Sequence, residues 1–109
     1  MRELRYYLAA DGTSPFAAWF AALAGPAAAR VAISLARLEA GNDSNVKAVG
    51  EGVLEYRIDW GPGYRVYFGK DGETIVILLT GGTKQRQQRD IDAAKAARGD
   101  YKRRRRPVG

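Results

Sequence analysis

Arginine and tyrosine side chains alternate with apolar ones along residues 53–91, in a pattern typical of two consecutive β-hairpins. A three-residue turn between the first two strands would place Arg57 opposite Tyr67. It would also place Asp59 opposite Arg65, on the same face of the sheet and away from the apolar side chains. The guanidinium group of arginine is a planar fork of donors that matches the oxygen atoms of a phosphate. The sequence therefore predicts a rigid, basic sheet surface suited to binding phosphate.

The intervening side chains of these strands are apolar and predict the core side of the sheet. The same turn would place Ile58 opposite Val66 on that side. The Asp-Gly pair at 71–72 indicates a two-residue turn, which would set Val66 against Ile77 in the next strand. Residues 74–80 are apolar on both sides, as is usual for a strand covered on both faces, so we expect them to form the central strand.

The composition narrows the chemistry open to this chain of 109 residues. It contains no cysteine and no histidine, which excludes disulfide bonds, thiolate metal sites and the usual general base and zinc ligand. We therefore expect no metal and no cofactor, and any catalysis must rely on Lys, Arg, Tyr, Glu, Asp or Gln side chains. No apolar run approaches the roughly 20 residues of a membrane-spanning helix, and the N-terminus lacks the features of a signal peptide. We expect a cytoplasmic protein that does not bind membranes.

Local signals outline the other elements of an α+β domain. Ser14 before Pro15 is a typical helix start, and the Gly-Pro pair at 25–26 ends that helix and opens a second one. We expect a small antiparallel or mixed sheet of about four strands, packed on one face by this N-terminal helical hairpin and followed by a C-terminal helix. The expected elements are a strand at 3–9, helices that start at Ser14 and Pro26, a loop at 42–52, the three strands described above and a helix at 84–98.

This arrangement would leave the second face of the sheet as a shallow cleft. The final helix follows the Gly-Gly pair at 81–82, so it would flank the cleft and bring Lys84 and Gln87 to its edge.

The formal net charge of +6 is concentrated at the C-terminal end, because Lys102 and the arginines at 103–106 supply five of the positive charges. Such a block of like charges is usually disordered and can add affinity for nucleic acid that does not depend on sequence. We therefore expect a folded domain at residues 1–100 and a basic, disordered tail at 101–109.

Three motifs of the chain resemble a known family in their order and spacing. They are GVLEYRI at 52–58, GPGYRVYF at 61–68 and GGTKQRQQRDI at 81–91. Through them, residues 3–98 are similar to the RelE/ParE superfamily of toxins from bacterial toxin–antitoxin modules, specifically its HigB-like addiction module killer protein branch. The resemblance implies a small RNase-like fold, a cognate antitoxin with a helix-turn-helix domain, and inhibition of translation by metal-independent cleavage of mRNA, in many members on the ribosome.

The resemblance also implies which residues form the active site. We expect the two matching arginines to bind the phosphate and Lys84 to transfer protons, with Tyr67 assisting or stacking on a base. Glu55 lies on the same face and is a second possible base, although Gly69 opposite it suggests a position at the edge. The matching positions are Arg57 in the first motif, Arg65 and Tyr67 in the second, and Lys84 and Gln87 in the third.

RNA binding is expected of Gln87, Arg86 and Lys47, the last of which lies in the predicted loop at 42–52. Gln87 would orient a nucleotide by hydrogen bonds, and Lys47 and Arg86 would attract the phosphates. Thr83, Gln85 and Arg86 replace residues that are usually acidic or small in the family, which makes this edge more basic. The substrate preference could differ accordingly.

Each of these residues also has an ordinary structural explanation. Arg65 opposite Asp59 would be a surface ion pair worth about 0.2–1 kcal/mol, and Tyr67 is a favoured strand residue. Lys84 could be a solvated surface lysine. Two other functions remain open, namely a ParE-like inhibitor of DNA gyrase, which performs no RNA chemistry, and a noncatalytic nucleic-acid-binding module.

Overall fold

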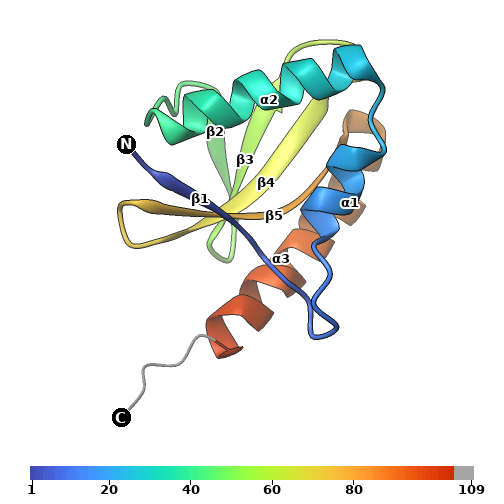
Figure 1. Cartoon of the computed structure of the whole chain (residues 1–109). Coiled ribbons are helices and arrows are strands. Elements are labelled where there is room, and N and C mark those ends of the chain that lie inside the picture. Colours follow the sequence, from blue (N-terminus) through green and yellow to red (C-terminus); the bar gives the residue numbers. More distant parts are fainter. Residues whose placement is uncertain (105–109) are drawn as a thin grey trace.

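The computed structural model describes residues 1–104 and shows a mixed five-stranded sheet with helices on both faces (Figure 1). In chain order the elements are β1 (Glu3–Tyr6), α1 (Pro15–Ala21), α2 (Gly25–Glu39), β2 (Val46–Gly50), β3 (Val53–Ile58), β4 (Tyr64–Asp71), β5 (Ile75–Thr83), the 3₁₀ turn η1 (Lys84–Arg86) and α3 (Gln87–Arg104). The strand order is β1-β5-β4-β3-β2, in which β1 runs parallel to β5 and the other neighbours are antiparallel. This arrangement confirms the expected α+β class. No helix within residues 1–104 is both long enough and apolar enough to cross a membrane.

The sheet has one strand more than expected, because part of the predicted loop at 42–52 forms the edge strand β2. Its Ala48 pairs with Leu54 of β3, and Val46 and Val49 are its half-buried side chains. The strand is short and irregular next to Gly50, so it lacks the sustained alternation that identifies strands from sequence. The central strand is β4 rather than β5, which lies between β4 and β1.

The two N-terminal helices begin where the sequence indicates. The Ser14 hydroxyl accepts a hydrogen bond from the backbone N–H of Ala17 at 3.0 Å, and Pro15 occupies the first turn of α1. Phe16 of α1 and Val31 of α2 are fully buried in a core on one face of the sheet. On this face α1 lies over β5 and α2 lies over β3, so each helix covers a different part of the sheet (Figure 1).

The C-terminal helix α3 covers the opposite face of the sheet and packs against it directly (Figure 1). Its buried residues Ile91 and Ala94 form a second core with Val53, Tyr67 and Leu79. The expectation that helices pack on one face only, with an open cleft on the other, is therefore wrong. The apolar residues of α3 recur at helical spacing, and it is this stripe that lies on the sheet.

The last turn of α3 extends into the region that was predicted as a disordered tail. Tyr101 packs against the second core, and its hydroxyl donates a hydrogen bond to the Asp71 carboxylate at 2.8 Å. Residues 101–104 are helical, so the prediction of disorder is wrong for them. The rest of the predicted tail, 105–109, lies outside the described residues.

The register of the first hairpin differs from the prediction by two residues. Residues 59–63 form the turn, so Ile58 pairs with Tyr64 and Arg57 pairs with Arg65. An even shift keeps every side chain on its original face. The predicted partners of the two arginines are therefore wrong, although the arginines share a face as expected.

The second hairpin is shifted by an odd number of residues, which exchanges the two faces of β5. The turn has three residues instead of two, and its Gly72 has a φ of 69°, a left-handed conformation that suits glycine. Phe68 therefore pairs with Leu78 instead of Ile75. As a result Leu78 belongs to the core under α1 and α2, while Ile77 packs under α3.

Candidate active site

A buried glutamate lies at the centre of a polar site next to the start of α3. The Glu55 side chain is 0% exposed, and its Oε2 accepts a hydrogen bond from Gln87 Nε2 at 3.0 Å. The carboxylate also lies 3.7 Å from Arg65 Nε and 3.7 Å from Lys47 Nζ. We call Glu55, Lys47, Arg65 and Gln87 the Glu55 cluster. It joins β2, β3, β4 and α3 around one carboxylate.

The strand register brings the members of this cluster together. Lys47 of β2 and Tyr67 of β4 are the direct partners of Glu55 in the neighbouring strands. Directly opposed residues place their side chains on the same face of a sheet, and here that face is the one that α3 covers. From β5 the chain passes through η1 into α3, whose first residue, Gln87, reaches Glu55.

Arg65 is buried as well, which shields the ion pair from water. The residue is 5% exposed, and its Nη1 donates a hydrogen bond to the Gly63 carbonyl at 2.6 Å. Among the described residues, neither Arg65 Nε nor Glu55 Oε1 has a hydrogen-bond partner. Buried polar atoms without partners are uncommon in folded proteins and call for an explanation, such as a catalytic role. Both atoms are buried, so another molecule reaches them only after a neighbouring side chain moves.

Tyr67 lies within the second core beside the cluster and is not part of an exposed surface. It is 0% exposed, and its hydroxyl has no hydrogen-bond partner in the part of the chain that the structure describes. Burial, and secondly the charge of the Glu55 carboxylate, raises the pKa of the phenol well above its ordinary value. The phenol therefore stays protonated at neutral pH. Because it is buried it cannot stack on a nucleobase, so that predicted role is wrong.

Arg57 lies beside the cluster on an accessible part of the sheet. It is exposed and is the direct partner of Arg65 in the register. The expected surface pair between Arg65 and Asp59 is absent from the described residues, where Arg65 pairs with Glu55 instead. Arg57 lines a hollow of about 350 Å³, which we call the β2 depression. Its lining residues are Ser44, Asn45, Val46, Lys47, Arg57 and Asp59.

Lys84, the first residue of η1, lies against the turn between β3 and β4. Its backbone N–H donates a hydrogen bond to the Pro62 carbonyl at 3.4 Å. A Cβ atom added at Gly63 would lie 3.3 Å from Lys84 Cβ and 3.1 Å from Arg65 Nη1. The structure therefore brings both Lys84 and Arg65 next to Gly63, and Lys84 is exposed there.

Arg86 is a predicted site residue that lies in η1 and makes no described contact with the cluster. It is exposed at the end of η1, and within residues 1–104 no hydrogen bond or ion pair joins it to Glu55. Its charge acts on Asp90. Burial raises the pKa of the Asp90 carboxyl group, and the positive charges of Arg86 and Arg89 oppose this increase. Arg86 thus contributes positive charge near the start of α3 rather than a contact within the cluster.

Sequence reasoning underestimated Glu55. The strand alternation places it on the face of the arginines, but the predicted register set it opposite Gly69 and near an edge. The structure pairs Gly69 with Ile77 and places Tyr67 opposite Glu55, with a strand on either side of it. One feature of the sequence does point to Glu55, because it is an acidic residue in the middle of an otherwise apolar and basic strand.

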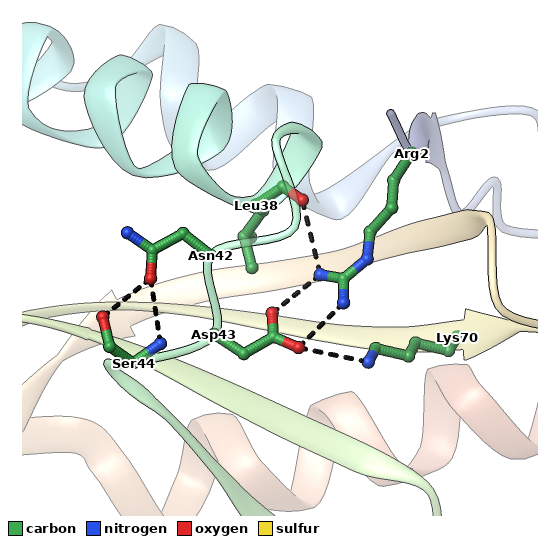
Figure 2. Close-up of polar contacts among 6 residues, drawn as sticks. All are labelled: Arg2, Leu38, Asn42, Asp43, Ser44 and Lys70. Atoms are coloured by element: carbon green, nitrogen blue, oxygen red, sulfur yellow. Dashed lines mark hydrogen bonds and ion pairs between the residues drawn. The ribbon is translucent and has the colours of Figure 1, made fainter.

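A second group of polar contacts fastens the loop between α2 and β2 (Figure 2). Arg2 donates hydrogen bonds to both carboxylate oxygens of Asp43, at 2.7 and 2.8 Å, and Lys70 donates another at 3.4 Å. The hydrogen bonds from Arg2 are the main reason why the pKa of Asp43 falls to about 2. The side-chain oxygen of Asn42 accepts hydrogen bonds from the N–H and the hydroxyl of Ser44, at 3.1 and 2.7 Å. These contacts fix the start of β2 and with it one wall of the β2 depression.

The fold and the Glu55 cluster together define a small α+β protein whose polar site is built around a buried carboxylate and a buried guanidinium. No protein-family model matches the chain. An uncharacterized protein of Haemophilus influenzae is 42% identical to it over 84 residues, which cover 76% of this chain and 85% of the Haemophilus protein. The chain belongs to the same family as that protein.

Proposed function

We propose that this protein is the toxin of a type II toxin–antitoxin module, with a RelE-like fold, and that it inhibits translation by cleaving mRNA. The observation that carries the proposal is the Glu55 cluster, in which a buried carboxylate and a buried guanidinium keep a free acceptor and a free donor beside exposed cations. Cleavage of RNA without a metal requires a base, donors for the phosphate and an acid, and these groups supply all three. The likeness of the three sequence motifs to the RelE/ParE superfamily supports the same activity.

In the proposed reaction the ribose 2′-oxygen attacks the adjacent phosphorus. The bond between the 2′-oxygen and phosphorus forms while the bond between phosphorus and the 5′-oxygen breaks, which leaves a 2′,3′-cyclic phosphate and a 5′-hydroxyl. Glu55 accepts the proton of the 2′-hydroxyl through Oε1, and the Lys84 ammonium group gives a proton to the 5′-oxygen. Arg57 and Arg65 donate hydrogen bonds to the nonbridging oxygens, where negative charge grows.

Access to Glu55 depends on the side chain of Lys47. Lys47 Nζ lies 3.7 Å from Oε1, and the Lys47 side chain is 62% exposed. An exposed lysine gains little from such an ion pair, so an incoming phosphate can compete with Glu55 for the ammonium group. RNA binding would draw Lys47 away and uncover the base, in keeping with the role in RNA binding that the sequence suggested.

Gln87 and Tyr67 act as positioning residues in this scheme. Gln87 donates its hydrogen bond to Oε2 and leaves Oε1 available for the proton of the 2′-hydroxyl. Tyr67 is the direct partner of Glu55 in the strand register and packs beside it in the second core, and because it is buried it does not touch the RNA. Arg86 adds to the positive charge that attracts the phosphates.

The partners of the proposed toxin follow from its activity. The substrate is mRNA, engaged in translation on the ribosome, which implies a cytoplasmic location. A cognate antitoxin with a helix-turn-helix domain would neutralise the toxin.

Incubation of the purified protein with translating ribosomes, followed by mapping of the mRNA ends, tests the proposal. We expect cuts in the codon at the ribosomal A site, and a rate lower by about 10²-fold for Arg57→Ala and for Lys84→Ala. Arg5→Ala is the control, because Arg5 is exposed on β1 at the opposite edge of the sheet, and it should cleave like the wild type. Intact mRNA with trapped gyrase–DNA complexes would support a ParE-like inhibitor instead, and intact mRNA with salt-sensitive binding would support a noncatalytic module.

A further inference from the structure

A second hollow adjoins the β2 depression at the edge of the sheet. It has a volume of about 230 Å³ and lies against α2, where Arg30 and Arg37 contribute to its lining. It shares Asn45 and Asp59 with the β2 depression. The two hollows therefore meet where β2 begins and β3 ends, and together they form one path from the Glu55 cluster to the face of the sheet that α2 covers. We call the part against α2 the α2 groove.

The exposed charges along this path are mainly positive. Lys47 and Arg57 are exposed at the end next to the Glu55 cluster, and Arg30 and Arg37 are exposed at the end on α2. Arg37 and Arg57 form no ion pair within residues 1–104. Asp59 is the acidic residue that lines both hollows, so the cations along the path outnumber the exposed carboxylates. Such an excess of positive charge favours an extended polyanion.

The α2 groove also presents a stacked arginine and an aromatic ring. The guanidinium carbon of Arg30 lies 5.2 Å from the centre of the Trp60 ring, and Trp60 stacks on Tyr64 with ring centres 6.1 Å apart. A guanidinium plane held in this way, or the indole beneath it, can stack on a nucleobase. Ile33, which is 49% exposed, adds an apolar surface beside Arg30.

We propose that the α2 groove binds the segment of single-stranded RNA that flanks the phosphate held at the Glu55 cluster. The proposal rests on the proposed function for the position of the reacting phosphate. The combination of unpaired arginines with a stacked guanidinium and indole matches the phosphates and bases of one strand. A duplex is too stiff to follow a path that turns from one face of a sheet to the other past the ends of two strands, whereas a single strand bends there readily.

Binding of noncleavable 2′-O-methyl RNA, measured by fluorescence anisotropy, tests the α2 groove. An oligonucleotide of about four nucleotides should occupy the Glu55 cluster alone, and one of about ten nucleotides should also fill the groove. For the longer oligonucleotide, the double variant Arg30→Gln/Arg37→Gln should lower the slope of log affinity against log salt by about 1.4, since each phosphate contact on a single strand contributes about 0.7. Between about 50 and 200 mM salt, the wild type should then lose about sevenfold more affinity than the variant. For the shorter oligonucleotide the variant should match the wild type.

The control variant Arg5→Gln/Lys95→Gln removes the same charge from β1 and α3, where both residues pair with exposed glutamates. It should leave the salt slope for the longer oligonucleotide unchanged. Equal slopes for the wild type and the Arg30/Arg37 variant, or an equal loss of affinity for both oligonucleotide lengths, would overturn the proposal. If the wild type cleaves mRNA but the slopes are equal, only the groove is refuted. If it cleaves no RNA and the slope still falls as stated, the groove stands and the proposed nuclease does not.

Discussion

Replacement of Glu55 by glutamine should destabilise the fold strongly, although the two side chains have nearly the same shape. The substitution leaves Arg65, which is 5% exposed, without the carboxylate that lies 3.7 Å from its Nε. Removal of one partner from a buried ion pair costs about 3–5 kcal/mol. Lys47 adds less than about 1 kcal/mol, because its side chain is 62% exposed. Since 3.7 Å is long for a charged hydrogen bond, we expect the lower end of the range, about 3 kcal/mol.

Urea unfolding, followed by tryptophan fluorescence and circular dichroism, measures this loss. In thermal unfolding, about 3 kcal/mol corresponds to a decrease in Tm of about 12–24 °C for a domain of this size. Glu51→Gln is the matched control. Like Glu55, Glu51 forms an ion pair with a lysine, Lys95, at 3.4 Å, but the Glu51 side chain is 72% exposed. The control should change the free energy of unfolding by less than about 0.5 kcal/mol.

A double-mutant cycle then tests whether the loss comes from the ion pair. Arg65→Met alone leaves the buried carboxylate of Glu55 uncompensated, whereas the double variant with Glu55→Gln contains neither charge. The double variant should be more stable than the sum of the single effects predicts, by about 1.5–3 kcal/mol. Additive effects, or a Glu55→Gln protein within about 0.5 kcal/mol of the wild type, would refute the description of the cluster as a coupled buried pair.

Three further predictions concern pH, packing and salt. In the folded state the pKa of Asp43 is lowered from 3.8 to about 2, so the unfolded chain binds more protons in this window and stability should fall as the pH drops through it. After allowance for solvent screening, the loss of stability measured by urea unfolding should be on the order of 1 kcal/mol. Asp43→Asn should abolish this pH-dependent loss. If the loss persists in the variant, Asp43 is not its source. Gly81→Ala should lower stability by about 1–3 kcal/mol, because a methyl group there overlaps the Trp19 ring. Gly25→Ala is the control and should be nearly neutral, because a methyl group at Gly25 meets open space. Equal melting temperatures for the two variants would contradict this packing. Deletion of residues 105–109 removes two arginines and should lower the salt slope of nonspecific RNA binding by about 1.4, whereas an unchanged slope would show that these arginines do not contact RNA.

The features predicted correctly are those that depend on residues close together in the chain. The start of α1 at Ser14 needs only the hydroxyl and proline that cap the first turn, and both are visible in the sequence. The register of β5 depended on whether the turn at Gly72 has two or three residues, which local sequence does not determine. The position of α3 against the second face depended on the packing of residues such as Ile91 and Leu79 into one core, which joins distant parts of the chain.

The same distinction applies to the candidate site. Alternation along the strands placed Arg57, Arg65 and Glu55 on one face, and this held because the register error in that hairpin was an even number of residues. Burial could not be inferred in the same way, since it depends on how α3 covers the sheet. Tyr67 was therefore expected at the surface and lies in the core, while Glu55 was expected near an edge and lies at the centre of the cluster.

The chemical nature of the RNA ends is the most direct test of the account. The proposed attack by the 2′-oxygen predicts that the protein, acting on mRNA in translating ribosomes, produces fragments with a 5′-hydroxyl and a 2′,3′-cyclic phosphate. A single 2′-deoxy substitution at the nucleotide before the cut should abolish cleavage, and Glu55→Gln should reduce its rate by about 10²–10⁴-fold at a temperature where the variant is folded. Fragments with a 5′-phosphate, or cleavage that continues at the 2′-deoxy position, would contradict the proposed role of the Glu55 cluster.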